Sequence, residues 1–263
     1  MTPVDVHQGK GPLVLGLPHT GTHVPQDIAA KLNTEGQALA DTDWHIHDLY
    51  DGLLPDATTV RATFHRYVID ANRDPGGESL YPGQNTTGLV PLTDFDGAAI
   101  WTDEPTQTDI AGRRVAFHAP YHAALQGELD RVKNLHGFAV LYDCHSIRSH
   151  IPFLFDGELP VLNLGTNNGA TCAPELEAIA WEIAQSSPYA SVLNGRFKGG
   201  WTTRHYGQPS GNIHAIQMEI AERAYLTAEA PPWDYDAGKA GRLRPWLKDI
   251  LDALVDTATE LHA

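Results

Sequence analysis

Two short apolar runs in this chain end at a histidine, and they limit the possible fold more than any other feature. The first run is Leu13–Pro18, followed by His19, and the second is Phe138–Cys144, followed by His145. Runs of this length are typical of strands buried inside a sheet. Ligands bind at the carboxyl ends of strands in open α/β sheets, so the two imidazoles are predicted to lie in a binding site.

The rest of the chain alternates strand and helix signals, which predicts an α/β fold. Further strands are predicted at 58–71, 161–164 and 213–220. Helices are predicted at 25–32, 39–54 and 120–136, from Pro174, and from Pro245 to near the C-terminus. Residues 76–112 are rich in Gly, Pro and Thr, which predicts a long loop excursion within a single domain spanning 1–263.

The composition narrows the classes of partner. The 18 Lys and Arg residues against 33 Asp and Glu give a net charge of −15, which argues against nucleic acid and anionic membranes. No apolar stretch approaches a membrane span, and no signal peptide is visible, so the cytoplasm is the expected compartment. Cys144 and Cys172 are then expected to be reduced. The oligomeric state stays open.

The 14 histidines are dispersed along the chain, so a metal site would have to be assembled in three dimensions. A catalytic zinc takes three protein ligands and keeps one open position. His19 and His145 supply two ligands, and Asp43 is the best-placed carboxylate for the third. Alternatively, Asp41 or Asp43 caps a helix, and one of three nearby histidines is the third ligand. These histidines are His23, His45 and His47.

Other polar residues stand out by their context. Glu219 lies within an apolar strand, so it either points outward or serves a site that uses its carboxylate. Arg73, Arg148 and Arg204 lie in turns or loops near candidate site residues, where a guanidinium can hold a carboxylate or form a surface ion pair. Ser146 and Cys144 flank His145, but no nucleophile motif surrounds them.

An ordered series of motifs resembles the N-formylglutamate amidohydrolase (N-formylglutamate deformylase) family of histidine catabolism. The series covers most of residues 13–226. Its segments are Pro18–Gly21, Asp41–Tyr50, Arg66–Pro75, Leu80–Gln84, Thr87–Pro91, Tyr142–Ser146, Gly199-Gly200 and His214–Glu219.

The resemblance implies a zinc-dependent hydrolase related in fold to zinc exopeptidases and aspartoacylase, with a mixed central sheet and helices on both faces. It implies that one zinc ion is bound by His19, Asp43 and His145, although other divalent transition metals would accept the same ligands. The wider superfamily places a glutamate three residues after the first histidine, where this chain has Thr22. The assignment of Asp43 therefore comes from the narrower family.

The resemblance also implies a reaction, the hydrolysis of N-formyl-L-glutamate to L-glutamate and formate. Glu219 is the expected general base and Arg73 the expected oxyanion partner. Further residues are expected to bind the acidic N-acyl amino acid substrate. These residues are Asn72, Arg148, Arg204, Tyr81 and Gln84. The alternatives are deacylation of another N-acyl acidic amino acid and a non-catalytic binding protein of the same fold.

Overall fold

The computed structural model describes residues 2–79, 83 and 85–263, and within them seven strands form one mixed sheet. The order across the sheet is β1-β3-β2-β4-β7-β5-β6. The strands are β1 (Val4–His7), β2 (Leu13–Leu17), β3 (Thr58–Ala62), β4 (Ala139–Ile147), β5 (Leu162–Gly165), β6 (Ser191–Leu193) and β7 (Ile213–Ala221).

The four central strands β3, β2, β4 and β7 run parallel. Strand β1 pairs antiparallel with β3, and β5 pairs antiparallel with β7 and parallel with β6. Every residue of β2 and β4 is buried, which explains why their sequences are continuous apolar runs rather than alternating ones. The carboxyl ends of β2, β4 and β7 lie at one edge of the sheet. This edge holds the candidate site.

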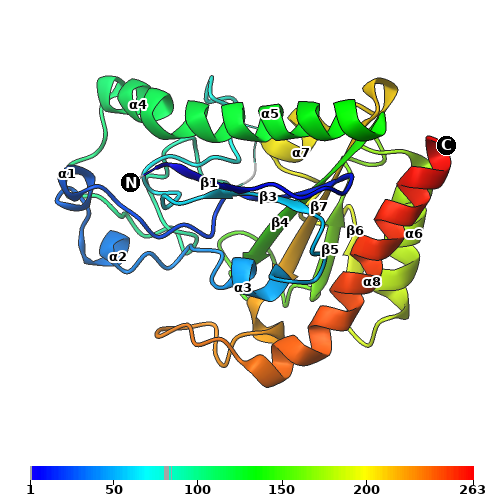
Figure 1. Ribbon diagram of the computed structural model, residues 1–263. Helices are drawn as coiled ribbons and strands as arrows, with labels where there is room; N and C mark the ends of the chain where they lie inside the picture. The colour runs from blue at the N-terminus through cyan, green and yellow to red at the C-terminus, as the bar shows by residue number, and fades with distance from the viewer. Residues whose placement is uncertain (1, 80–82, 84) are drawn as a thin grey trace.

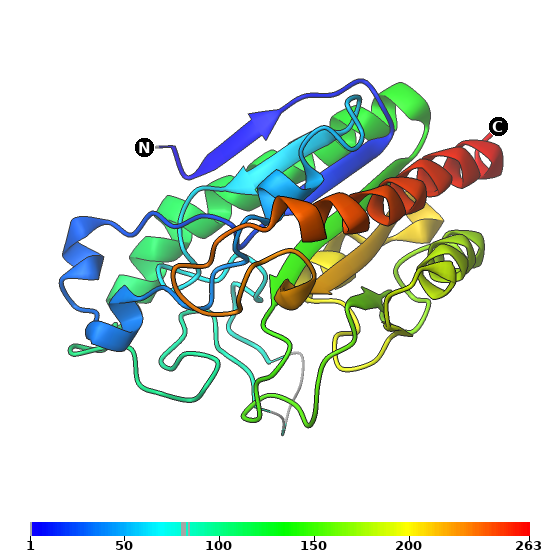
Figure 2. The ribbon, with the colours of Figure 1, turned by 90° about the horizontal axis from the view of Figure 1, so that it is seen from below.

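Helices cover both faces of the sheet (Figure 1). The bounds are α1 (Gln26–Ala29), α2 (Thr34–Gln37), α3 (Ile46–Tyr50), α4 (Gln107–Arg113), α5 (Ala119–His136), α6 (Pro174–Ser186), α7 (Trp201–Tyr206) and α8 (Ala237–Leu261). A π-helical turn, Arg114–His118, joins α4 to α5, and 3₁₀ turns lie at Pro209–Gly211 and Glu222–Ala224. Turning the molecule shows α5 behind the sheet and α8 in front of it (Figure 2).

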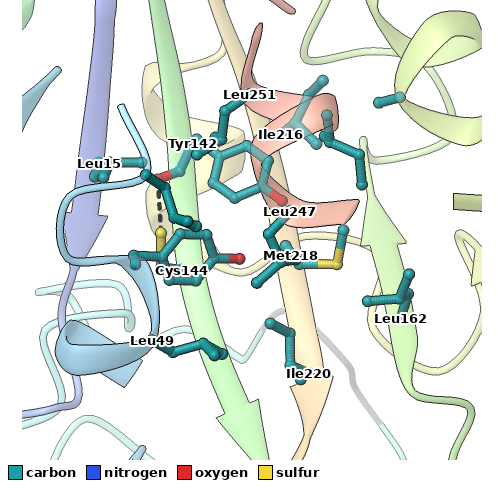
Figure 3. Close-up of a cluster of buried hydrophobic side chains, with 14 of the residues drawn as sticks. Leu15, Leu49, Tyr142, Cys144, Leu162, Ile216, Met218, Ile220, Leu247 and Leu251 are labelled. Atoms are coloured by element: carbon teal, nitrogen blue, oxygen red, sulfur yellow. Dashed lines mark hydrogen bonds between the residues drawn. The ribbon is translucent and has the colours of Figure 1, made fainter. Parts of the chain in front are cut away.

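Successive side chains of the central strands point to opposite faces of the sheet and pack into two hydrophobic cores. Tyr142 and Cys144 of β4 pack toward α3, α6 and α8, together with Leu15 and Met218 (Figure 3). Leu141 points to the opposite face, where it packs with residues of α5. The predicted α/β fold, with a mixed sheet and helices on both faces, is confirmed.

Several predicted element bounds are wrong. Only Ile46–Tyr50 of the predicted helix 39–54 is helical, because Leu39 and His45 adopt positive φ angles of 51° and 56° that interrupt a right-handed helix. The predicted strand 58–71 leaves the sheet after Ala62. Its later apolar residues are buried in turns, so alternation there reflects burial and not strand structure.

Two other boundaries also differ. Helix α8 begins at Ala237, not at Pro245, and Asp236 caps it by accepting a bond from the Lys239 amide. Pro245 lies on the exposed side of this helix. Proline has no backbone N–H to donate to the carbonyl four residues earlier, and on this side water can bind that carbonyl instead. His145 lies inside β4 rather than after it, since the strand continues to Ile147. Strands β1 and β6 and helices α4 and α7 were not predicted.

Candidate metal centre

Three chain segments bring His19, Asp43 and His145 together. His19 lies two residues beyond β2, and His145 lies on the neighbouring parallel strand β4. Asp43 lies in a turn before α3, and its amide donates to the His19 carbonyl at 3.0 Å, which fixes this turn beside the end of β2. All three side chains are buried.

The ligand atoms of these three residues converge on one point. His19 Nδ1 lies 3.2 Å from His145 Nδ1, and Asp43 Oδ2 lies 3.1 Å from His145 Nδ1 and 3.7 Å from His19 Nδ1. A tetrahedral zinc with bonds of about 2.1 Å would separate its ligands by about 3.4 Å. The observed spacings bracket that value.

Three charged residues contact these side chains through the atoms that do not face the centre of the cluster. His19 Nε2 donates to Asp70 Oδ1 at 2.6 Å, and His145 Nε2 lies 3.3 Å from Asp143 Oδ2. Arg66 pairs with Asp43 Oδ1. A carboxylate on the remote nitrogen of a metal-binding histidine fixes the tautomer and strengthens the ligand.

The hydrogen-bond pattern fits a cation. Asp70 accepts the Nε2 proton of His19, and Asp143 is near enough to accept that of His145. With these tautomers, both Nδ1 atoms present lone pairs to the same point as Asp43 Oδ2. Three buried acceptors facing one another are unfavourable unless a proton or a metal ion lies between them. Within the described part of the chain, His19, Asp43 and His145 form the group of His, Cys, Asp or Glu residues whose ligand atoms lie close enough together to share one metal ion.

The electrostatics of the cluster agree with this interpretation. Burial lowers the pKa of His19, and Arg66 lowers it further, so this imidazole is neutral and ready to bind a metal. Burial acts to raise the pKa of Asp43, but Arg66 and the two histidines outweigh it and hold the carboxyl ionised. Burial also opposes protonation of His145, yet Asp143 and Asp43 raise its pKa well above the usual value. A metal ion would displace that proton.

Glu219 lies on β7 directly beside His145 of β4. Burial raises the pKa of its carboxyl to about 7. Gln217 Nε2 donates to Glu219 Oε2 at 3.0 Å and orients it. The side chain lines a small pocket with a cavity volume of about 80 Å³, together with His19 and His145. The sequence left two readings of Glu219 open, an outward-facing side chain or one that faces a site. In the structure its side chain faces the pocket beside the candidate metal centre.

The other predicted site residues fall into three groups. Asn72 and Arg73 line the pocket, and Asn72 Nδ2 lies 3.1 Å from His145 Nε2. Arg148 pairs with Asp96 at 2.8 Å, and Arg204 donates to the Gly199 carbonyl at 2.8 Å. Neither arginine is among the described residues that line the pocket. Tyr81 and Gln84 lie outside the described residues.

The alternative assignments for Asp41, His45 and His47 take other partners. Asp41 accepts bonds from the Tyr67 hydroxyl and the Phe95 amide, and α3 is preceded by His45 rather than by a capping aspartate. His45 Nδ1 lies 2.8 Å from Asp48 Oδ2, and His47 Nδ1 lies beside the Thr20 hydroxyl.

Five residues of this site were not predicted from the sequence. Arg66, Asp70 and Asp143 surround the cluster, Gln217 orients Glu219, and Arg196 lines the pocket. Asp143 was detectable because it stands two residues before His145 on the same strand, and therefore on the same face. Arg196 had no local signal.

Comparisons with known proteins agree with the geometry. A family model described as N-formylglutamate amidohydrolase matches residues 11–226. The chain is 43% identical over 260 residues to an N-formylglutamate deformylase of Pseudomonas putida, with 97% of each chain covered. A protein of the same name from Pseudomonas aeruginosa is also 43% identical, with the same coverage.

Solved structures share the fold. N-formylglutamate amidohydrolase from Ralstonia eutropha JMP134 superposes with a TM-score of 0.80 at 24% identity, covering 100% of this chain and 98% of that one. The gene product Atu2144 from Agrobacterium tumefaciens superposes with a TM-score of 0.75 at 17% identity, covering 98% and 96%.

The fold and the site together define an α/β protein with a buried candidate metal centre at the carboxyl edge of its sheet. The family match covers most of the chain and includes every residue of that centre. This protein belongs to the N-formylglutamate amidohydrolase family, as the resemblance in its motifs predicted.

Proposed function

We propose that this protein hydrolyses N-formyl-L-glutamate to L-glutamate and formate. The observation that carries the proposal is the position of Glu219, a buried carboxyl beside the three converging side chains of the candidate metal centre. Relatives that are 43% identical over nearly the whole chain carry the name N-formylglutamate deformylase, which supports this substrate. As the family resemblance implies, we place the reaction in histidine degradation. We keep the cytoplasm as the proposed compartment.

His19, Asp43 and His145 would hold the metal, and we propose zinc because two imidazoles and one carboxylate form a donor set common at catalytic zinc sites. When bound, such an ion supplies a Lewis acid that polarises the formyl carbonyl and makes a water molecule more acidic.

Glu219 has the position and the pKa of a general base. A pKa of about 7 lets the carboxylate accept a proton from the attacking water near neutral pH. As the bond between the formyl carbon and the nitrogen breaks, the same carboxyl donates this proton to the leaving amine. The formic acid that is released then loses its own proton, which the free amine takes up, so the products are formate and the ammonium form of L-glutamate.

We propose that Arg73 stabilises the negative charge that develops on the formyl oxygen. Its guanidinium donates to the Thr87 carbonyl and hydroxyl, both at 2.9 Å, and to the Asn72 carbonyl at 3.0 Å. These bonds use three of the five N–H groups of an arginine and fix its plane at the pocket wall. A donor held rigidly in advance is what stabilises an oxyanion.

The substrate carboxylates require a cation at the pocket mouth, and Arg196 is the best-placed candidate. It lines the same pocket as Glu219 and is anchored by bonds to the Leu154 and Asn85 carbonyls at 3.0 and 3.1 Å. We propose that Arg196 binds a substrate carboxylate. The earlier assignments of Arg148, Arg204, Tyr81 and Gln84 stay predictions.

The first test is formate release from N-formyl-L-glutamate, with N-acetyl-L-glutamate and N-formyl-L-aspartate alongside. We expect release from the first substrate, its loss on chelation and its return with zinc. A His145→Ala variant should lose both metal and activity, whereas His45→Ala should keep both. A His145→Ala protein that retains metal and turnover would refute the site, and preferential turnover of the acetyl compound would refute the substrate.

A further inference from the structure

The segment 66–75 carries Arg66, Asp70, Asn72 and Arg73 but contains no helix or strand. Regular hydrogen bonding therefore does not hold most of its carbonyl groups in place. Side chains from the helical stretch 107–136 bind several of these carbonyls instead. Arg113 Nη1 donates to the Val68 carbonyl at 3.2 Å, and Arg114 Nη1 donates to that of Pro75 at 3.2 Å.

Two histidines of the same stretch bind the carbonyls on either side of Asn72. His122 Nε2 lies 2.8 Å from the Ala71 carbonyl, and His118 Nε2 lies 3.0 Å from the Arg73 carbonyl. A carbonyl only accepts, so both Nε2 atoms carry protons. The Tyr206 hydroxyl, 2.9 Å from His122 Nδ1, then donates to that nitrogen.

Burial keeps both imidazoles neutral. It lowers the pKa of His122 to about 3, and it lowers the pKa of His118 below the usual value. The two rings lie against each other with centroids 4.3 Å apart, and Trp201 of α7 covers them. A neutral imidazole packed in this way is a rigid donor with one fixed tautomer.

The helical stretch that carries His118 and His122 has an irregular turn beside them. Residues 114–118 form a π-helical turn, closed by a bond from the Ala119 amide to the Arg114 carbonyl. Pro120 follows directly, and its ring would clash with a carbonyl in a regular α-helix. The wider turn relieves that clash, and π-turns of this kind are frequent at functional sites.

We infer that His118 and His122 are positioning residues that hold the backbone immediately before Asn72 and after Arg73 in place for catalysis. This inference rests on the proposed function, in which Arg73 stabilises the developing oxyanion. Asn72 has two further hydrogen bonds. Its side-chain Oδ1 accepts from the Thr202 backbone amide at 2.8 Å, and its backbone amide donates to Asp70 Oδ1 at 2.8 Å. Without the two imidazoles, the Ala71 and Arg73 carbonyls lose these donors, and the backbone that carries the Asn72 and Arg73 side chains is held less firmly.

The test compares His118→Leu and His122→Leu with His118→Gln and His122→Gln, in metal-replete protein. We expect each leucine variant to lower kcat about 10- to 100-fold with little change in KM, since an oxyanion donor acts in the transition state. The glutamine variants keep an N–H donor and should recover to within a few-fold of wild type. Bound metal should stay at wild-type content in all four.

His136 provides the matched control. It lies on the same helix and its Nε2 donates to the Lys10 carbonyl at 2.8 Å, far from the pocket. His136→Leu should leave kcat unchanged. If His122→Leu behaves like His136→Leu, or if the leucine and glutamine variants lose equal activity, the positioning role is refuted.

Hydrogen exchange separates this inference from the proposed function. Amides of residues 66–75 should exchange faster in the leucine variants than in wild type, whatever the substrate. Unchanged exchange would overturn the inference. A wild-type protein that releases no formate would overturn the proposed function, and the exchange result alone would then decide whether the histidines hold the segment.

Discussion

At the scale of single residues, the centre combines acceptors that are competent to bind a metal with charged groups that hold them there. The lone pairs of His19 and His145 converge with a carboxylate oxygen of Asp43. Each of these three residues has a charged partner on its other side, namely Asp70, Asp143 and Arg66. The chemistry of the site therefore depends on six residues rather than three.

Replacement of Glu219 by glutamine should separate metal binding from catalysis. The amide has nearly the same shape and can still accept the bond from Gln217, but it cannot accept a proton. We expect kcat to fall by about 10²- to 10⁴-fold, the usual contribution of a general base, with wild-type metal content. Steady-state kinetics with metal analysis checks this result. Activity within ten-fold of wild type would exclude Glu219 as the base.

The pH profile gives a second measurement of the same residue. The ionised form of Glu219 is the active one, so kcat/KM of the wild type should fall as the pH drops below its pKa of about 7. The positive charge of a bound metal favours the carboxylate and moves this limb to lower pH. The limb should be absent from the residual activity of Glu219→Gln.

Asp70→Asn should weaken metal binding without removing a ligand. Asparagine still accepts the His19 proton, but it lacks the charge that strengthens the imidazole as a ligand. We expect affinity to fall about 10- to 100-fold, measured by competition with a chelator. Asp130→Asn, on the exposed side of α5, serves as the control. Equal affinity in all three proteins would show that the charge of Asp70 plays no part.

The sequence predicted the two histidines because each follows a buried apolar run, a purely local signal. The context of Asp43 made it the best-placed carboxylate, but the family resemblance was needed to choose it over the alternatives. The roles of Glu219 and Arg73 also came from that resemblance. Arg66 and Arg196 were not predicted because their partners, such as Asp43 and Leu154, are distant in the sequence. Contacts of that kind are set by tertiary packing, and nothing in the neighbouring residues indicates them.

At the scale of secondary-structure elements, the long α5 and the continuous strands were the most predictable. Their apolar spacing extends over enough residues to be distinctive. The short turn-rich segments 39–45 and 63–71 were assigned wrongly. Their apolar residues are buried without a regular period. The positive φ angles at Leu39 and His45 depend on tertiary contacts, which the spacing of apolar residues in the sequence does not indicate.

The C-terminal end of α8 should loosen in acid. His214 on β7 accepts a bond from the Ala173 amide, so its Nε2 proton is donated to His262 Nε2 at 3.0 Å, one residue after α8. Burial, with His262 nearby, lowers the pKa of His214 from 6.5 to about 4. The unfolded chain therefore binds this proton more readily than the folded protein, and stability falls as the pH drops from 6.5 toward 4.

Thermal denaturation at pH 7 and pH 5 checks this expectation. After allowance for solvent screening, we expect His214 to account for on the order of 1 kcal/mol of the loss, which is a few degrees in Tm. His214→Gln should show a smaller difference in Tm between the two pH values than wild type. An identical difference in both proteins would contradict the assignment.

At the scale of the whole molecule, the candidate metal centre links segments from both halves of the chain. No helix within residues 2–79, 83 and 85–263 is long and apolar enough to cross a membrane. Cys144 and Cys172 are buried free thiols, so no disulfide joins the segments. A bound metal would be the strongest cross-link between β2, the turn before α3, and β4.

Metal binding should therefore stabilise the entire fold. A ligand present at about 1,000 times its Kd adds about 4 kcal/mol, which corresponds to about 10 °C in Tm for a chain of this size. Calorimetry with zinc and with a chelator measures the shift. His19→Ala should show none of it and His45→Ala should show all of it. A chelated wild type that melts at the zinc-loaded temperature would contradict this expectation.

The pairing of β2 with β4 also determines when the candidate centre could first bind a metal. His19 and His145 are separated by 126 positions along the chain, and Asp43 and His145 by 102. Closing loops of that size is among the slow steps of folding, since the entropy of a long segment is lost before its contacts form. A chain still emerging from the ribosome has no ligand set until β4 has been made and has paired. Capture of a metal would thus be a late event that follows completion of the sheet, and incomplete chains would compete poorly for the ion.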